Sequence, residues 1–123
     1  MTVRDVYEAT GGDYESAVRR FMNESRLEKF VKMFLDDPCY RDLETALSVK
    51  DTEGAFRAVH TLKGVCLNMS FSKLFESVDT VTEALRHADA DNADDMARVY
   101  DAMKPLRIHY SSIIDSIRSM CQE

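Results

Sequence analysis

One histidine stands among residues whose types and spacing could carry a phosphoryl group. His60 lies in the stretch Ala58-Val59-His60-Thr61-Leu62-Lys63-Gly64. A neutral imidazole is nucleophilic near pH 7, because its unperturbed pKa is about 6.5. Lys63 can stabilise an anionic group that arrives on the ring, and Gly64 removes side-chain bulk beside it. These residue types predict phosphoryl transfer, which needs mostly positioning and charge stabilisation.

The same stretch predicts a helix over residues 52–69 with one apolar arc and one exposed arc. At about 100° per residue, seven apolar side chains fall on a single arc that must face a core. They are Ala55, Ala58, Val59, Leu62, Val65, Cys66 and Met69. His60 lies near the centre of the opposite arc, so we expect it to point to solvent.

The exposed arc is unusual for a plainly solvated surface. Arg57 and Lys63 flank His60 at i−3 and i+3. Gly64 costs about 1 kcal/mol relative to alanine inside a helix, and a need for close approach by another molecule would offset that cost. We therefore predict that the surface around the histidine binds a partner protein, and that apolar and polar side chains at its edge contact this partner. These edge residues are Phe56, Leu67, Asn68 and Phe71.

Start signals along the chain predict further helices and no strands. We expect helices over residues 14–22, 26–35 after a Ser25/Glu28 capping box, 40–49, 52–69 after Asp51, from Ser70 or Ser72 to about 87, and 93–120 after an Asn92/Asp95 capping box. Pro105 should kink or interrupt the last helix. Short joints favour antiparallel neighbours. The predicted fold is all-α: an antiparallel up-and-down four-helix bundle (residues 25–123) with a short N-terminal helical cap (1–24), together forming one domain.

Charge and composition exclude several classes of protein. The formal net charge of −6 argues against general nucleic-acid binding. No apolar stretch approaches about 18 residues, so we expect no membrane span. The three cysteines are odd in number and widely spaced, which favours a reducing cytoplasm over a disulfide framework or a zinc site. We expect a cytoplasmic monomer without a metal site.

The residues around His60 carry a resemblance to a known family. The stretch from Ala58 to Gly64 resembles the signature A-x-H-x-L-K-G of histidine-containing phosphotransfer (HPt) domains. The similarity continues through Asn68-Met69-Ser70-Phe71 and Leu74, where the family often has N-L-G-x-x-x-L. Such domains are four-helix bundles that relay phosphate between receiver-domain aspartates in two-component signalling. The resemblance implies that His60 is phosphorylated, that Lys63 stabilises the phosphate and that Gly64 is the small residue beside it.

Two positions depart from the family pattern. Ser70 stands where glycine is common, and we expect its side chain to cap the next helix. Some members place a glutamine on the following helix, where it bonds the active histidine. Thr82 falls about there in this chain, and it could bond the imidazole Nδ1 only weakly or through water. Arg86, one turn further, could add positive charge near the site.

The chain has no P-loop and no glycine-rich nucleotide loop. We therefore expect a phosphoryl carrier without ATP-dependent kinase activity and without a cofactor of its own. The partner implied by the resemblance is a response-regulator receiver domain, which supplies the aspartate and a bound magnesium ion. A hybrid sensor histidine kinase can be a second partner. Two alternatives stay open: a helical adaptor that binds a receiver or kinase domain without transfer, and the phosphoryl-accepting domain of a chemotaxis-type kinase.

Overall fold

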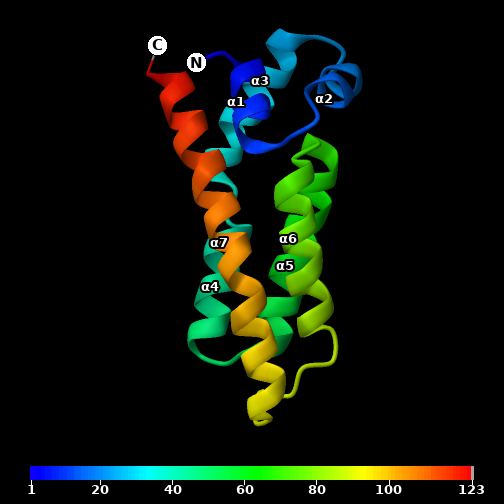
Figure 1. Cartoon of the computed structure of the whole chain (residues 1–123), viewed down its shortest axis with the longest axis vertical. Coiled ribbons are helices and arrows are strands. Elements are labelled where there is room, and N and C mark those ends of the chain that lie inside the picture. The colour runs from blue at the N-terminus through cyan, green and yellow to red at the C-terminus, as the bar shows by residue number, and fades with distance from the viewer. Residues whose placement is uncertain (123) are drawn as a thin grey trace.

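The computed structural model describes residues 1–122, and within that range the chain forms helices and no strands (Figure 1). This confirms the predicted all-α class. The elements in chain order are α1 (Val3–Thr10), α2 (Tyr14–Phe21), α3 (Glu24–Met33), the 3-10 turn η1 (Phe34–Asp36), α4 (Cys39–Ser48), α5 (Thr52–Met69), α6 (Ser72–Leu85) and α7 (Ala93–Cys121). No helix in these residues is long and apolar enough to cross a membrane.

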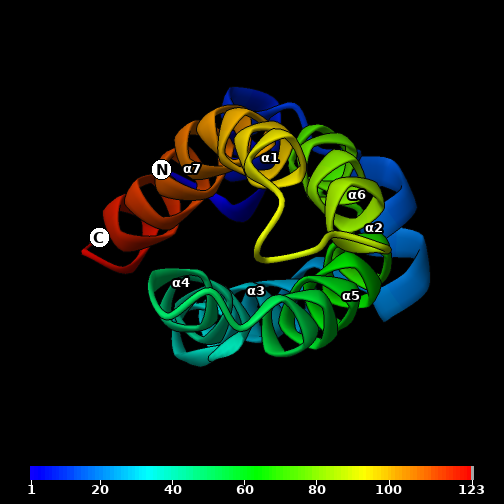
Figure 2. The same cartoon turned by 90° about the horizontal axis from the view of Figure 1, so that it is seen from below.

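The predicted antiparallel bundle is also confirmed. Along the chain, α4 packs on α5, α5 on α6 and α6 on α7, and each runs opposite to the one before it (Figure 1). The view along the bundle shows α4, α5, α6 and α7 arranged around a common centre (Figure 2). The α3 helix stands above α4, so two shorter helices share one side of the bundle (Figure 1).

The N-terminal helices close the end of the bundle at which both termini lie (Figure 1). The α1 helix packs on α7, whereas α2 contacts α3 and α5. Tyr7 is fully buried, and its hydroxyl donates a hydrogen bond of 2.7 Å to the Met69 carbonyl at the end of α5. The Asp13 N–H donates to the Ser70 carbonyl over 2.9 Å. This cap therefore fixes the carboxyl end of the helix that carries His60.

Two of the predicted helix starts are wrong. The side-chain cap of α3 is Asn23, which lies two residues before the predicted cap, Ser25. The Asn23 side chain accepts a hydrogen bond of 2.8 Å from the Arg26 N–H. Ser70 ends α5 instead of capping α6: it adopts the left-handed conformation, with φ of 55°, and its N–H bonds back to the last turn of α5. No side-chain cap is present at the start of α6.

The last helix begins at the predicted place but behaves differently inside. The Asn92 side chain accepts from the Asp95 N–H at 3.0 Å, whereas the Asp95 carboxylate accepts from the Asp89 N–H, so only half of the predicted capping box forms. We predicted that Pro105 would kink or interrupt this helix. The α7 helix continues through Pro105, so the interruption is wrong and the kink stays a prediction. Met103 and Leu106 on either side of the proline are fully buried, and this packing offsets the lost backbone hydrogen bond.

Phe71 belongs to the core, which corrects its expected role in docking. Its side chain is fully buried. Its ring centroid lies 5.3 Å from that of Tyr7 and 5.1 Å from that of Phe34. The residue follows α5 in sequence, but the turn at Ser70 directs it inward, so it joins the N-terminal cap to the bundle.

Replacement of Phe71 by alanine should therefore lower the free energy of unfolding by about 3–5 kcal/mol, since it removes a large buried ring. Leu67→Ala is the control, because Leu67 is 57% exposed and should change stability by less than about 0.5 kcal/mol. Urea denaturation of both variants measures the difference. Similar midpoints for the two variants would contradict this placement of Phe71.

Candidate functional site

The α5 helix presents His60 to solvent because its opposite arc is anchored in the core. Val59, Leu62 and Cys66 are fully buried, whereas His60 is exposed. The helix starts where predicted, since the Asp51 carboxylate accepts from the Gly54 N–H at 2.9 Å. The sequence-based assignment of His60 to the exposed arc agrees with this arrangement.

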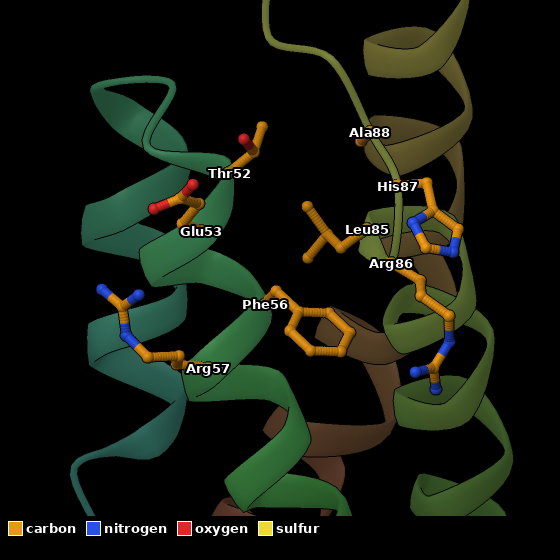
Figure 3. Close-up of a pocket in the computed structure, with 8 residues that line it drawn as sticks. All are labelled: Thr52, Glu53, Phe56, Arg57, Leu85, Arg86, His87 and Ala88. Carbon is orange, nitrogen blue, oxygen red and sulfur yellow. The ribbon is translucent and has the colours of Figure 1, made fainter.

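The imidazole ring is flanked by an aromatic ring one turn earlier. The ring centroids of Phe56 and His60 lie 5.8 Å apart at an angle of 40°. The Arg86 guanidinium carbon lies 5.4 Å from the Phe56 centroid, within the range of a cation–π contact. Phe56 extends from α5 toward α6 (Figure 3). It is therefore held between Arg86 and His60, and it limits the orientations open to the imidazole.

Thr82 does not support the imidazole, contrary to the prediction. Its side chain is fully buried, and its hydroxyl donates to the Val78 carbonyl of the same helix at 2.8 Å. The sequence predicted that residue 82 of α6 lies at about the same height along the bundle as His60. The orientation of α6 about its own axis, however, directs the Thr82 side chain into the core. Its hydroxyl is satisfied locally, so Phe56 remains the described ring neighbour of His60.

Lys63 is tied to the neighbouring helix. Its ammonium lies 2.7 Å from the Asp79 Oδ1 on α6, and both side chains are partly exposed. The same ammonium is 5.9 Å from the centroid of the Phe75 ring. Lys63 thus leaves α5 on the side that faces α6, one turn from His60.

The other two predicted cations lie on different sides of the face. Arg86 forms an ion pair with Glu83, with a closest distance of 2.9 Å. Its hydrogen bonds lower the pKa of the Glu83 carboxyl below the usual value. Arg57 is exposed and extends from the side of α5 opposite to Phe56 (Figure 3). Arg86 contacts Phe56, the aromatic neighbour of His60.

Open space surrounds Gly64. A Cβ atom built at this position meets no atom within 4 Å apart from those of its chain neighbours and of the surrounding helix backbone. Leu67 and Asn68, one turn further, are exposed as predicted. The Leu67 carbonyl accepts a hydrogen bond of 2.6 Å from Arg20 of α2, so the N-terminal cap borders this end of the face. A partner can approach α5 closely along the line from His60 to Asn68.

A surface pocket lies at the other end of the His60 face, between the start of α5 and the end of α6 (Figure 3). Phe56 and Leu85 project into it. Glu53 and Arg57 also line it, although the ends of their side chains point away from it (Figure 3). Its remaining lining residues are Thr52, Arg86, His87 and Ala88. Within residues 1–122, no group of three or more His, Cys, Asp or Glu side chains is placed to hold a metal ion.

The other two histidines have different surroundings. His109 is half-buried, and one of its ring nitrogens contacts the Ser77 hydroxyl. Burial lowers the pKa of His109. His87 is exposed just beyond the end of α6. It has no lysine three residues later and no helical glycine four residues later, as His60 has. His60 alone among the three lies beside an exposed helical glycine.

Asp79 is the residue of this site that sequence reasoning missed. The register of the two antiparallel helices could have predicted it. If residue 82 lies opposite residue 60, then residue 79 lies opposite residue 63. The sequence pattern suggested cations near His60 but did not suggest that a carboxylate would neutralise one of them.

Fold and site together define a class of protein: an antiparallel helical bundle that presents a single imidazole on an open helix face. A comparison with protein-family models matches residues 29–120 to the Hpt domain, and the chain therefore belongs to the Hpt domain family. Hpt domains are phosphoryl carriers that act through histidine in phosphorelays. Searches of curated proteins and of solved structures found no match. The family match starts after α2, so the first two helices lie outside it.

The open space at Gly64 predicts the effect of an added methyl group. Gly64→Ala should raise the free energy of unfolding by roughly 0.5–1 kcal/mol, because alanine is favoured inside a helix and its Cβ meets no neighbour. Thermal unfolding followed by circular dichroism measures the change. A lower melting temperature would mean that this side of α5 is packed against another part of the protein.

Proposed function

We propose that the chain is a phosphotransfer protein of a two-component phosphorelay, in which His60 accepts a phosphoryl group from a receiver-domain aspartate and returns it to one. The observation that carries the proposal is an exposed imidazole one helical turn from a glycine whose Cβ position is empty. Membership of the Hpt family supports the same chemistry. The resemblance of Ala58 to Gly64 to the family signature assigns the reaction to His60.

The transfer step needs few groups from this chain. The lone pair of one ring nitrogen attacks the phosphorus of the partner's aspartyl phosphate. The N–P bond forms as the P–O bond to the aspartate breaks, and the aspartate leaves as a carboxylate. The other ring nitrogen keeps its proton, so the ring is an imidazolium until that proton passes to water. The reverse sequence returns the group to an aspartate.

Each neighbour of His60 has a defined part in this step. Phe56 lies against the ring and limits the orientations open to it. Lys63 attracts the phosphoryl oxygens once the group has arrived. Gly64 leaves room for the loops that carry the partner's aspartate. The partner supplies the in-line aspartyl phosphate and the magnesium ion that neutralises its charge.

Leu67 and Asn68 extend the exposed face beyond Gly64 and fit a docking surface. The partly buried side chain of Phe56 borders the same face. A receiver domain is the partner that this surface and the chemistry of aspartyl phosphate favour. A hybrid sensor histidine kinase can carry such a receiver. We further propose that the domain acts as a monomer and that it works in a reducing cytoplasm; the free thiols of Cys39, Cys66 and Cys121 support the second part.

An adaptor without transfer is the alternative function. It would use the same face for binding but would have no need of a nucleophile. The exposed imidazole, the lysine and the cleared position at Gly64 occur together on one helix face, and this combination favours transfer over binding alone.

Loss of the imidazole should abolish phosphorylation. With a panel of phosphorylated receivers as donors, the wild-type domain should gain a label that is lost in acid and kept in base, as expected for a phosphoramidate. His60→Gln should gain none, and His109→Gln, a matched control, should be labelled like the wild type. Label in His60→Gln, or an acid-stable label in the wild type, would refute the assignment.

A large side chain at position 64 should separate stability from transfer. Gly64→Gln should fold at least as stably as the wild type, because glutamine is a better helix former than glycine and the position is open. Its rate of transfer from a receiver should fall by about ten- to a hundredfold, since poor alignment of reacting groups has effects of that size. Gly64→Ala is the matched control. Wild-type rates in Gly64→Gln would show that no close approach occurs here.

A further inference from the structure

The lysine that should stabilise the phosphoryl group is already paired with a carboxylate. The Lys63 ammonium lies 2.7 Å from the Asp79 Oδ1, with side-chain exposures of 30% and 43%. The contact joins α5 to α6 and draws the lysine side chain toward α6. Both partners remain accessible to solvent and therefore to an incoming anion.

A second cation, Arg86, also interacts electrostatically with Asp79, but it forms no ion pair with this carboxylate. The next acidic residue along this part of α6, Glu83, is engaged by Arg86 through two hydrogen bonds of 2.9 and 3.3 Å. Arg86 in turn lies against Phe56. Among the described residues, Lys63 is the cation that pairs with Asp79. The Lys63 ammonium is thus in direct contact with the Asp79 carboxylate before any phosphate arrives.

A phosphoryl group on His60 changes that balance. It adds between one and two negative charges at neutral pH, one helical turn from Lys63. One ammonium cannot contact both anions as fully as it contacts one, and the two anions repel each other across a partly solvated face. The phosphorylated form is therefore less stabilised by Lys63 than it would be without the Asp79 carboxylate.

We propose that Asp79 is a positioning residue that competes with the phosphoryl group of His60 for the Lys63 ammonium and so keeps that group easy to pass on. The proposal rests on the proposed function of His60. Asp79 acts through Lys63 and touches no reacting atom. Its effect is on the equilibrium between phosphorylated domain and phosphorylated receiver, which it shifts toward the receiver.

Removal of the carboxylate charge tests the proposal. Asp79→Asn should shift the equilibrium by roughly two- to fivefold toward the phosphorylated domain, the range expected for a partly exposed ion pair. Asp79→Glu should restore the wild-type position, because it keeps the charge. Glu76→Gln is the control for loss of a negative charge elsewhere on α6, since Glu76 is exposed and one turn from Asp79; it should leave the equilibrium unchanged.

A second pair of variants shows whether Lys63 transmits the effect. In a Lys63→Ala background, Asp79→Asn should change the equilibrium by less than half of its effect in the wild type, because the shared ammonium is gone. Melting temperatures measured on the same preparations establish that every variant is folded. An unchanged equilibrium in Asp79→Asn, or a shift toward the receiver, would overturn the proposal. So would an equal effect with and without Lys63.

A partner-free donor separates this proposal from the function on which it rests. Phosphoramidate transfers its phosphoryl group to imidazole with release of ammonia and needs no receiver. The label that depends on His60 should then be lost two- to fivefold more slowly in Asp79→Asn than in the wild type. If no receiver transfers phosphate but the lifetimes differ in this way, the proposed relay fails, whereas the competition between Asp79 and the phosphoryl group for the Lys63 ammonium still holds. Equal lifetimes and equal equilibria would reject the role of Asp79 alone.

Discussion

The division of α5 into a buried arc and an exposed arc is the constraint on which the rest of the structure depends. Val59, Leu62 and Cys66 are fully buried, and rotation of the helix about its axis would expose them at a cost of about 1.5–3 kcal/mol for each large apolar side chain. This packing determines the direction in which His60 points. The nucleophile needs no strain or special backbone conformation, because its exposure follows from the burial of the residues behind it.

Both ends of α5 are held by contacts that keep this rotation fixed. Asp51 satisfies a backbone donor at the start. At the other end, the buried hydroxyl of Tyr7 bonds the Met69 carbonyl, and Asp13 bonds the Ser70 carbonyl. Ser70 takes a left-handed conformation that is unfavourable for a residue with a side chain. The cap contacts at this turn offset that cost, so helices outside the family match stabilise the helix that carries the site.

The sequence was sufficient to predict the features of α5 that depend on that helix alone, although it misplaced the side-chain caps of α3 and α6. The bounds of α5, its Asp51 cap, its buried arc and the open position at Gly64 all follow from periodicity and local propensity. Residues whose placement depends on a neighbouring helix were harder to predict. Thr82 and Phe71 lie near the site along the chain, but the rotation of α6 and the turn at Ser70 direct them into the core.

Electrostatic pairing across helices was the other feature that local patterns did not reveal. The pairing of Lys63 with Asp79 requires knowledge of how α6 is rotated against α5 as well as of the residue opposite. The two cations of the site that lie near α6, Lys63 and Arg86, are therefore paired with the carboxylates of Asp79 and Glu83 before phosphate arrives. A carrier must accept a group and also release it, and weak stabilisation of the phosphorylated form suits that purpose.

Long-range ¹H–¹⁵N NMR of the imidazole rings, recorded before and after incubation with a phosphorylated receiver, tests the central claim most directly. The chain has three histidines, so each ring can be followed separately. The account predicts a phosphorus-bound ring nitrogen in His60, with the ring signals of His87 and His109 retaining the pattern of unphosphorylated imidazole. Phosphorylation of His87 or His109 with His60 unchanged would contradict it.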